Sequence, residues 1–131
     1  MTIYHWDLRK KKKTGGSKKA FRGKRKHESG DVQADTRIST AGDLVQRKRV
    51  KGGGFKLSLG ESKSVNVNFS DGRTTRAEIL ALADNPSNPL YTRKGIITKG
   101  AILKTSLGLV RVSSKTGSDG VLNGRIMEEK K

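Results

Sequence analysis

The chain has 131 residues, of which 29 are Lys or Arg and 12 are Asp or Glu, so its formal net charge is +17. Its length supports a single domain with a modest core, and the absence of cysteine excludes disulfides and thiolate metal sites. Because it has no run of about eighteen apolar residues and no apolar leader of secretory length, we expect a cytoplasmic protein without a membrane partner.

The first eight residues form a short apolar tip that contains Tyr4 and Trp6. This tip is either a frayed terminus or an anchor whose rings stack on a base of the partner or enter a pocket on it. Trp6 is the single tryptophan, so its fluorescence would distinguish the two alternatives.

Residues 9–26 follow as an almost purely cationic segment. Eleven of these eighteen residues are basic and none is acidic. With so little apolar surface to bury, the segment is expected to be a disordered, self-repelling arm, and we place the end of the arm near residue 30. Gly15 and Gly16 add flexibility, but the upstream glycine and the strand of a true phosphate loop are missing.

So many cations without an anion are costly unless a polyanion neutralises them. The arm is therefore predicted to bind nucleic acid, and RNA in particular, instead of serving only solubility or targeting. The predicted contact residues of the arm are Arg9, Lys10, Lys11, Lys12, Lys13, Gly15, Gly16, Lys18, Lys19, Arg22, Lys24, Arg25 and Lys26.

From residue 31 onward the composition changes to short apolar alternations separated by turn residues. Strands are expected over residues 36–40, 44–50, 55–59, 65–69, 74–83, 101–105, 109–112 and 121–127. Residues 74–83 could also form a short helix, although the Asp-Gly hairpin turn before them favours a strand. Residues 85–89 contain two prolines and are expected to form a loop. This pattern predicts an all-β fold in which residues 31–131 form a small barrel of about six to eight short antiparallel strands, and residues 1–30 form the arm.

Further basic positions lie within the predicted body. The three glycines of residues 52–54 are flanked by Lys51 and Lys56. They form either a plain turn or a loop whose bare backbone approaches a phosphate. The predicted contacts of the body are Arg49, Lys51, Gly52, Gly53 and Lys56, with a secondary patch of Arg93, Lys94 and Lys99.

Catalysis has little support in the sequence. The two histidines, His5 and His27, lie far apart and have no partner at metal-ligand spacing. The few carboxylates form no pair suited to acid–base chemistry and no cluster suited to a nuclease metal site. We therefore expect no enzymatic activity, no cofactor and no metal.

Several short motifs follow one another in a definite order along the chain. They are Thr14-Gly15-Gly16 after the basic run, Lys24-Arg25-Lys26 with Glu28 and Gly30, Arg49-Val50-Lys51-Gly52-Gly53, Asn85-Pro86-Ser87-Asn88, Ile96-Ile97-Thr98-Lys99-Gly100-Ala101-Ile102 with Thr105 and Gly108, and Val112-Ser113 with Gly117, Asp119-Gly120-Val121 and Asn123. This order resembles the "eight e" family of small-subunit ribosomal proteins of archaea and eukaryotes, nearly from end to end. The chain is short like archaeal members, and it has His27 and Ser29 where the family usually has an aromatic–leucine pair.

The resemblance implies a structural component of the small ribosomal subunit, with a β-barrel body and an N-terminal extension threaded among ribosomal RNA helices. Its implied partners are ribosomal RNA and neighbouring ribosomal proteins, and we expect a monomer when the protein is isolated. The alternative is a chromatin or nucleoid protein that condenses DNA with the same arm.

Overall fold

The structure is a computed structural model that describes residues 11–19, 25–28, 32–50 and 52–127. The chain divides into two units, Met1–Gln33 and Ala34–Lys131. Among the described residues, every strand and the α-helix belong to the second unit.

Within the first unit, residues 11–19 form a tight turn. Lys11 and Ser17 form an isolated antiparallel bridge, and the N–H of Gly15 donates a hydrogen bond to the carbonyl of Lys12 at 3.0 Å. Gly15 has a φ of +83°, which glycine adopts without strain. A 3-10 helix, η1 (Lys26–Glu28), also belongs to this unit. The predicted disorder of the whole arm in the free protein stays a prediction.

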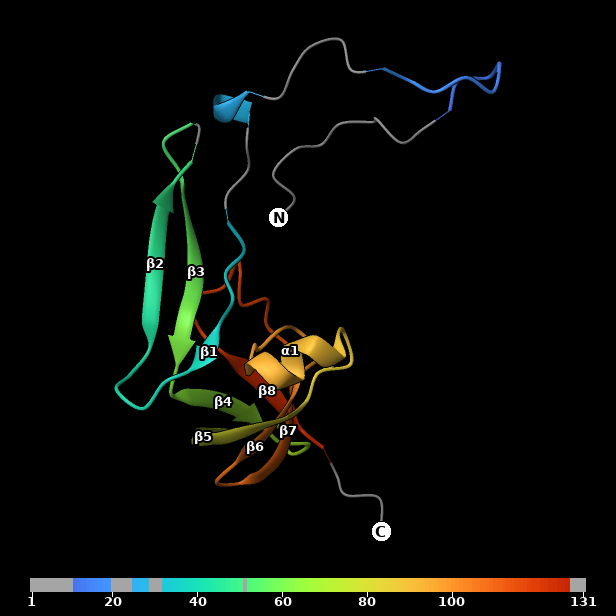
Figure 1. The fold of residues 1–131 in the computed structure, drawn as a ribbon. Helices are drawn as coiled ribbons and strands as arrows, with labels where there is room; N and C mark the ends of the chain where they lie inside the picture. Colours follow the sequence, from blue (N-terminus) through green and yellow to red (C-terminus); the bar gives the residue numbers. More distant parts are fainter. Residues whose placement is uncertain (1–10, 20–24, 29–31, 51, 128–131) are drawn as a thin grey trace. The chain divides into compact units, whose positions relative to one another are not determined.

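The second unit contains two sheets and one short helix (Figure 1). Its elements are β1 (Arg37–Ile38), β2 (Leu44–Arg49), β3 (Phe55–Ser62), β4 (Ser64–Asn68), β5 (Thr74–Asp84), α1 (Pro89–Lys94), β6 (Ile102–Thr105), β7 (Gly108–Val112) and β8 (Asn123–Ile126). Strands β1, β3 and β2 form a three-stranded sheet, and β4 to β8 form a closed barrel in sequence order. Neighbouring strands are antiparallel except for β1–β3 and the β4–β8 pair that closes the barrel, which are parallel.

The barrel core follows from the alternation of its strands. Every second residue points inward, so Val65 and Val67 of β4, Leu103 of β6, and Val110 and Val112 of β7 are buried together. Ala77, Ile79, Ala101 and Leu122 complete much of this cluster. Of the intervening residues, Asn68, Lys104 and Arg111 face solvent, whereas Ile102 and Leu109 are half-buried apolar residues.

A glycine allows β8 to approach β7 closely. A Cβ atom at Gly124 would collide with Cγ1 of Val110 and would lie 3.1 Å from the carbonyl oxygen of Arg111. Gly124 lies opposite Val112 in the β7–β8 ladder. The absence of a side chain at this position therefore lets the small barrel close.

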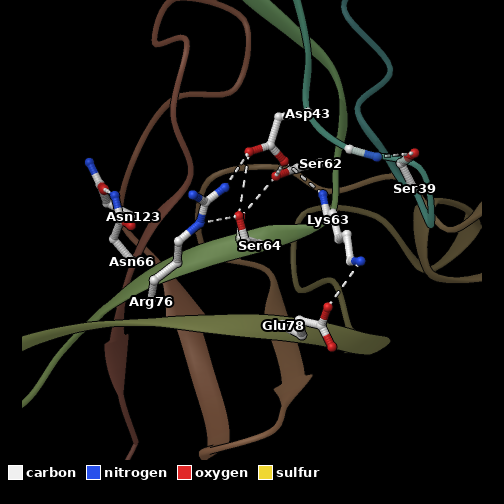
Figure 2. Close-up of polar contacts among 10 residues, drawn as sticks. Ser39, Asp43, Ser62, Lys63, Ser64, Asn66, Arg76, Glu78 and Asn123 are labelled. Carbon is white, nitrogen blue, oxygen red and sulfur yellow. Dashed lines mark hydrogen bonds and ion pairs between the residues drawn. The ribbon is translucent and has the colours of Figure 1, made fainter.

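The chain passes from the three-stranded sheet into the barrel at Lys63, the single residue between β3 and β4. Figure 2 shows the carboxylate of Asp43 directed at this corner. It accepts hydrogen bonds from the Lys63 N–H at 2.8 Å and from the Ser62 hydroxyl at 2.9 Å. Arg76 of β5 adds an ion pair at 3.2 Å. Asp43 thus joins the start of β2 to both sheets.

Helix α1 is held by its caps and by a buried amide. The Asn88 side chain accepts a hydrogen bond from the Leu90 N–H at 2.9 Å, and Gly95 ends the helix with a φ of +66°. Asn85, which is 1% exposed, donates to the Ile96 carbonyl and accepts from the Thr98 hydroxyl, both at 3.0 Å. These bonds fix the connection between β5 and β6.

The predicted all-β fold with a closed barrel is confirmed, and residues 74–83 are a strand as favoured. The barrel itself has five strands, not six to eight, because β1, β2 and β3 pair among themselves in a separate sheet. Its closure is also parallel instead of antiparallel. Helix α1 was not predicted, since its six residues are too short for a helical period to stand out.

Candidate nucleic-acid interface

The β2–β3 hairpin carries a dense group of cations. Residues 44–60 include five Lys or Arg and no Asp or Glu. Figure 1 shows these two strands extending beyond the barrel. The hairpin therefore presents an extended basic surface.

The hairpin register sorts these cations onto two faces. Lys48 lies directly opposite Lys56, and Arg49 lies opposite Phe55. Residues that face each other across an antiparallel pair point to the same side of the sheet, and like charges in this arrangement repel. The two lysines thus share one face, while Arg47 and Arg49 share the other. The hairpin thus presents cations on both of its faces.

An aromatic ring lies among the cations. The guanidinium carbon of Arg47 is 3.7 Å from the centroid of the Phe55 ring, a cation–π contact. Phe55 remains 53% exposed. Stacking of Arg47 on the ring limits the conformations of its guanidinium group and leaves part of the aromatic surface accessible. Exposed aromatic rings beside cations are typical of surfaces that bind nucleic-acid strands.

The tip of the hairpin exposes its backbone. The Val50 N–H donates to the Gly54 carbonyl at 2.9 Å and closes the loop. Gly52 and Gly53 have φ values of +84° and +81°, and no atom lies within 4 Å of a Cβ built at either position. The glycines are thus required by backbone conformation and not by crowding. Lys51 lies outside the described residues.

The predicted half-buried alternation of β3 is correct only near the barrel. Leu59 is 1% exposed, whereas Leu57 and Phe55 are 41% and 53% exposed. The N–H of Leu59 donates to the Thr116 carbonyl at 2.8 Å, so the loop between β7 and β8 packs on the base of the hairpin. The hairpin extends past the barrel (Figure 1), so no described residue covers Phe55 to the same extent.

The structure separates the members of the predicted secondary patch by element. Arg93 and Lys94 are exposed in the last turn of α1. Lys99 is the exposed second residue of a turn in which the Ala101 N–H donates to the Thr98 carbonyl at 3.1 Å. Lys99 lines a groove on the barrel, and neither Arg93 nor Lys94 is among the residues that line it.

The arm residues that the structure describes are exposed. They are Lys11, Lys12, Lys13, Gly15, Gly16, Lys18 and Lys19 around the turn, and Arg25 and Lys26 at η1. Four predicted contacts, Arg9, Lys10, Arg22 and Lys24, lie outside the described residues, as do Tyr4 and Trp6.

Sequence reasoning did not select four further cations that lie on the strands. Arg47 and Lys48 belong to the hairpin strands, and Arg111 and Arg125 line the same groove as Lys99. Arg111 alternates with the buried Val110 and Val112, so its position in the sequence indicates an outward-facing side chain. Arg47 and Lys48 are consecutive and therefore face opposite sides of the hairpin. The pairing of Arg111 with Arg125 depends on a strand register that the sequence does not display.

The described residues contain no group of three or more His, Asp or Glu side chains placed to hold a metal ion. Among these residues, no helix combines the length and apolar character needed to cross a membrane.

Comparisons with known proteins agree with the motif order. The family model described as Ribosomal protein S8e matches residues 6–127. The small ribosomal subunit protein eS8 of Staphylothermus marinus is 45% identical over 124 residues, which cover 94% of this chain and 94% of the relative. Proteins with the same name from Methanosarcina barkeri and Sulfolobus acidocaldarius are 42% and 38% identical. They cover 91% of this chain in each case, and 94% and 93% of the relatives.

Proposed function

Because this chain belongs to the ribosomal protein S8e family, we propose that it is a structural component of the small ribosomal subunit. In this proposal it binds ribosomal RNA through the basic arm and the β2–β3 hairpin, acts without catalysis, and lies beside other ribosomal proteins in cytoplasmic ribosomes. We also propose that the isolated protein is a monomer. Archaeal relatives that are named small ribosomal subunit proteins support the location.

The observation that carries the RNA proposal is the concentration of basic residues in two segments of the chain. Residues 9–26 contain eleven cations and residues 44–60 contain five, and neither segment contains an acidic residue. Phosphate groups neutralise such segments, and release of the condensed counterions of the RNA supplies free energy of binding. Phosphate contacts determine position and orientation but carry no base sequence directly. The protein would therefore recognise the shape of folded RNA.

The hairpin and the arm have different roles in this proposal. The arm supplies many cations on a segment with little apolar content, so it can follow an irregular path between RNA helices. The hairpin supplies cations on a paired backbone, where Arg47 and Phe55 are already stacked. Because the hairpin is ordered before binding, its contacts cost less conformational entropy than those of the arm.

The test is the binding of the full chain to small-subunit ribosomal RNA over a range of salt concentrations. If about six to ten phosphates are contacted, the affinity falls by roughly 10³–10⁵ between 50 and 200 mM salt. Replacing Lys10, Lys11, Lys12 and Lys13 together by Gln should weaken binding. It should also lower the slope of log affinity against log salt by about four.

Measuring the binding of the full chain to a matched DNA duplex at the same salt concentration distinguishes the ribosomal proposal from a nucleoid function. Preference for the folded ribosomal RNA, and co-sedimentation with the small subunit after a high-salt wash, are the expected results. Equal affinity for DNA and RNA, together with loss from the subunit in the wash, would contradict the ribosomal proposal and favour the nucleoid alternative.

A further inference from the structure

A groove on the barrel surface is lined by three cations from different parts of the chain. It has a volume of about 600 Å³ and lies at β7, β8 and the turn that precedes β6. Lys99 comes from that turn, Arg111 from β7 and Arg125 from β8. Among the described residues, none of those that line this groove is acidic. The groove thus brings together three cationic side chains on the barrel.

The two arginines are placed as direct neighbours by the strand register. Arg111 lies opposite Arg125 in the β7–β8 ladder, and side chains at such positions have Cβ atoms about 4.5–5.5 Å apart. Both side chains are exposed and, among the described residues, neither forms an ion pair or a side-chain hydrogen bond. Like charges directly opposite each other destabilise a sheet. An anion bound between them would remove that cost.

The third cation is positioned by backbone structure. Gly100 has a φ of +88° and its N–H donates to the Val112 carbonyl at 2.8 Å, which fastens the Thr98–Ala101 turn to β7. The buried Asn85 side chain accepts a hydrogen bond from the Thr98 hydroxyl at 3.0 Å. The backbone of Lys99 is therefore held beside the groove before any ligand arrives.

The remaining lining suits a nucleotide backbone better than a small inorganic anion alone. Ile126 and Met127 add apolar surface next to the cations, and Met127 is 39% exposed. A ribose can pack on such a surface while its phosphates meet guanidinium groups, which bind phosphate with two parallel hydrogen bonds. The acidic side chain of a partner protein would use the arginines but not this apolar surface.

We propose that this groove is a third RNA contact of the protein, in which Arg111, Arg125 and Lys99 bind backbone phosphates of folded RNA. The inference rests on the proposed function for the identity of the RNA. It adds a contact on the rigid barrel, which would fix the orientation of the body independently of the arm and the hairpin.

The test compares three variants of the full chain for binding to small-subunit ribosomal RNA between 50 and 200 mM salt. Replacing both groove arginines by Gln (R111Q/R125Q) should weaken binding and lower the slope of log affinity against log salt by about two. R111K/R125K keeps both charges and should retain the slope. The control R37Q/R73Q removes two exposed arginines that do not line the groove, and its slope should stay close to that of the wild type.

Two outcomes of this comparison would overturn the inference. One is an unchanged slope for R111Q/R125Q at wild-type stability in urea. The other is an equal loss in R37Q/R73Q, which would indicate a general effect of charge.

A second measurement tests the groove even if the wild-type chain fails to bind ribosomal RNA. Such a failure would contradict the proposed function itself. A short RNA duplex, inorganic phosphate and a glutamate-rich peptide are titrated separately into the labelled full chain. The RNA duplex should shift the NMR signals of Lys99, Gly100, Arg111 and Arg125 at lower concentration than the other two ligands. Stronger shifts with the peptide would replace RNA by an acidic protein partner and overturn the inference. Equal shifts with free phosphate would reduce the groove to a general anion site and would also overturn it.

Discussion

The carboxylate of Asp43 accepts a hydrogen bond of 2.8 Å from the backbone N–H of Lys63, twenty residues further along the chain. Lys63 is the residue at which the chain leaves the three-stranded sheet and enters the barrel. The bond therefore fixes the direction of the hairpin relative to the barrel. Since the hairpin carries the basic surface, a residue without any proposed RNA contact helps to position that surface.

We predict that Asp43→Asn lowers the free energy of unfolding by roughly 1–3 kcal/mol, because hydrogen bonds to a charged acceptor are stronger than neutral ones. If the amide oxygen replaces Oδ1, the amide nitrogen places a donor where the Ser64 hydroxyl and the Arg76 guanidinium now donate to Oδ2. Urea unfolding of the full chain would measure the change. The control is Glu78→Gln, which removes an exposed ion pair to Lys63 of 3.1 Å and should cost at most about 1 kcal/mol. Equal effects of the two substitutions would contradict this role of Asp43.

The same carboxylate should give the protein an acid-sensitive component of stability. Partial burial by itself would raise the pKa of Asp43, but hydrogen bonds from the Lys63 N–H and from Ser62, with smaller effects of Ser64 and Arg76, outweigh it and lower the pKa below its ordinary value. A lowered pKa in the folded state favours folding at pH values above the pKa of the unfolded chain, about 3.9. This contribution is lost as the pH falls through the folded-state pKa.

Unfolding free energies of the wild type and of Asp43→Asn should therefore converge as the pH is lowered from 7 to 2. The largest separation should lie above about pH 4. A difference between the two proteins that stays constant over this range would show that the charge of Asp43 makes no contribution.

Gly124→Ala should destabilise the barrel by about 1–3 kcal/mol, the usual cost of overpacking a core. The added methyl group would meet Val110, which is fully buried and has a stiff β-branched side chain. The matched control is Gly117→Ala, because no atom lies within 4 Å of a Cβ at Gly117 and its φ is outside the left-handed region. Thermal or urea unfolding would compare them, and a wild-type stability of Gly124→Ala would show that β7 and β8 can separate at little cost.

The hairpin proposal predicts a loss of RNA affinity without a loss of stability. Arg49→Gln combined with Lys56→Gln removes two exposed cations from opposite faces of the hairpin, and the salt slope should fall by about two. The control, Arg73→Gln with Lys115→Gln, removes one Arg and one Lys from turns outside the hairpin. A similar reduction in both double variants would indicate that only total charge matters.

Phe55→Leu tests the aromatic ring separately from the cations. It keeps an apolar side chain at the position but removes the surface on which Arg47 stacks. If a base of the RNA stacks on Phe55, binding should weaken by about 1–3 kcal/mol while the salt slope is unchanged, because no phosphate contact is lost. An unchanged affinity would limit the contribution of the hairpin to its charges.

The sequence by itself determined the charge of the arm, the family and most of the strands. Val65, Val67, Val110 and Val112 alternate with polar residues, and this period of two is a local property of the chain. The ordered motifs also indicated the family, because their spacing is read directly along the sequence. The clustering of cations at residues 9–26 and 44–60 requires no knowledge of the fold.

Only the tertiary structure decided which strands close the barrel and which side chains meet. The parallel β4–β8 closure, the contact of Gly124 with Val110 and the pairing of Arg111 with Arg125 join residues that are far apart in the chain. Strand pairing decides the first and strand register the other two, and both are set by packing across the whole core instead of by neighbours in sequence. For the same reason Phe55, which the alternation predicted to be half-buried beside Leu57 and Leu59, is exposed where the hairpin extends past the barrel.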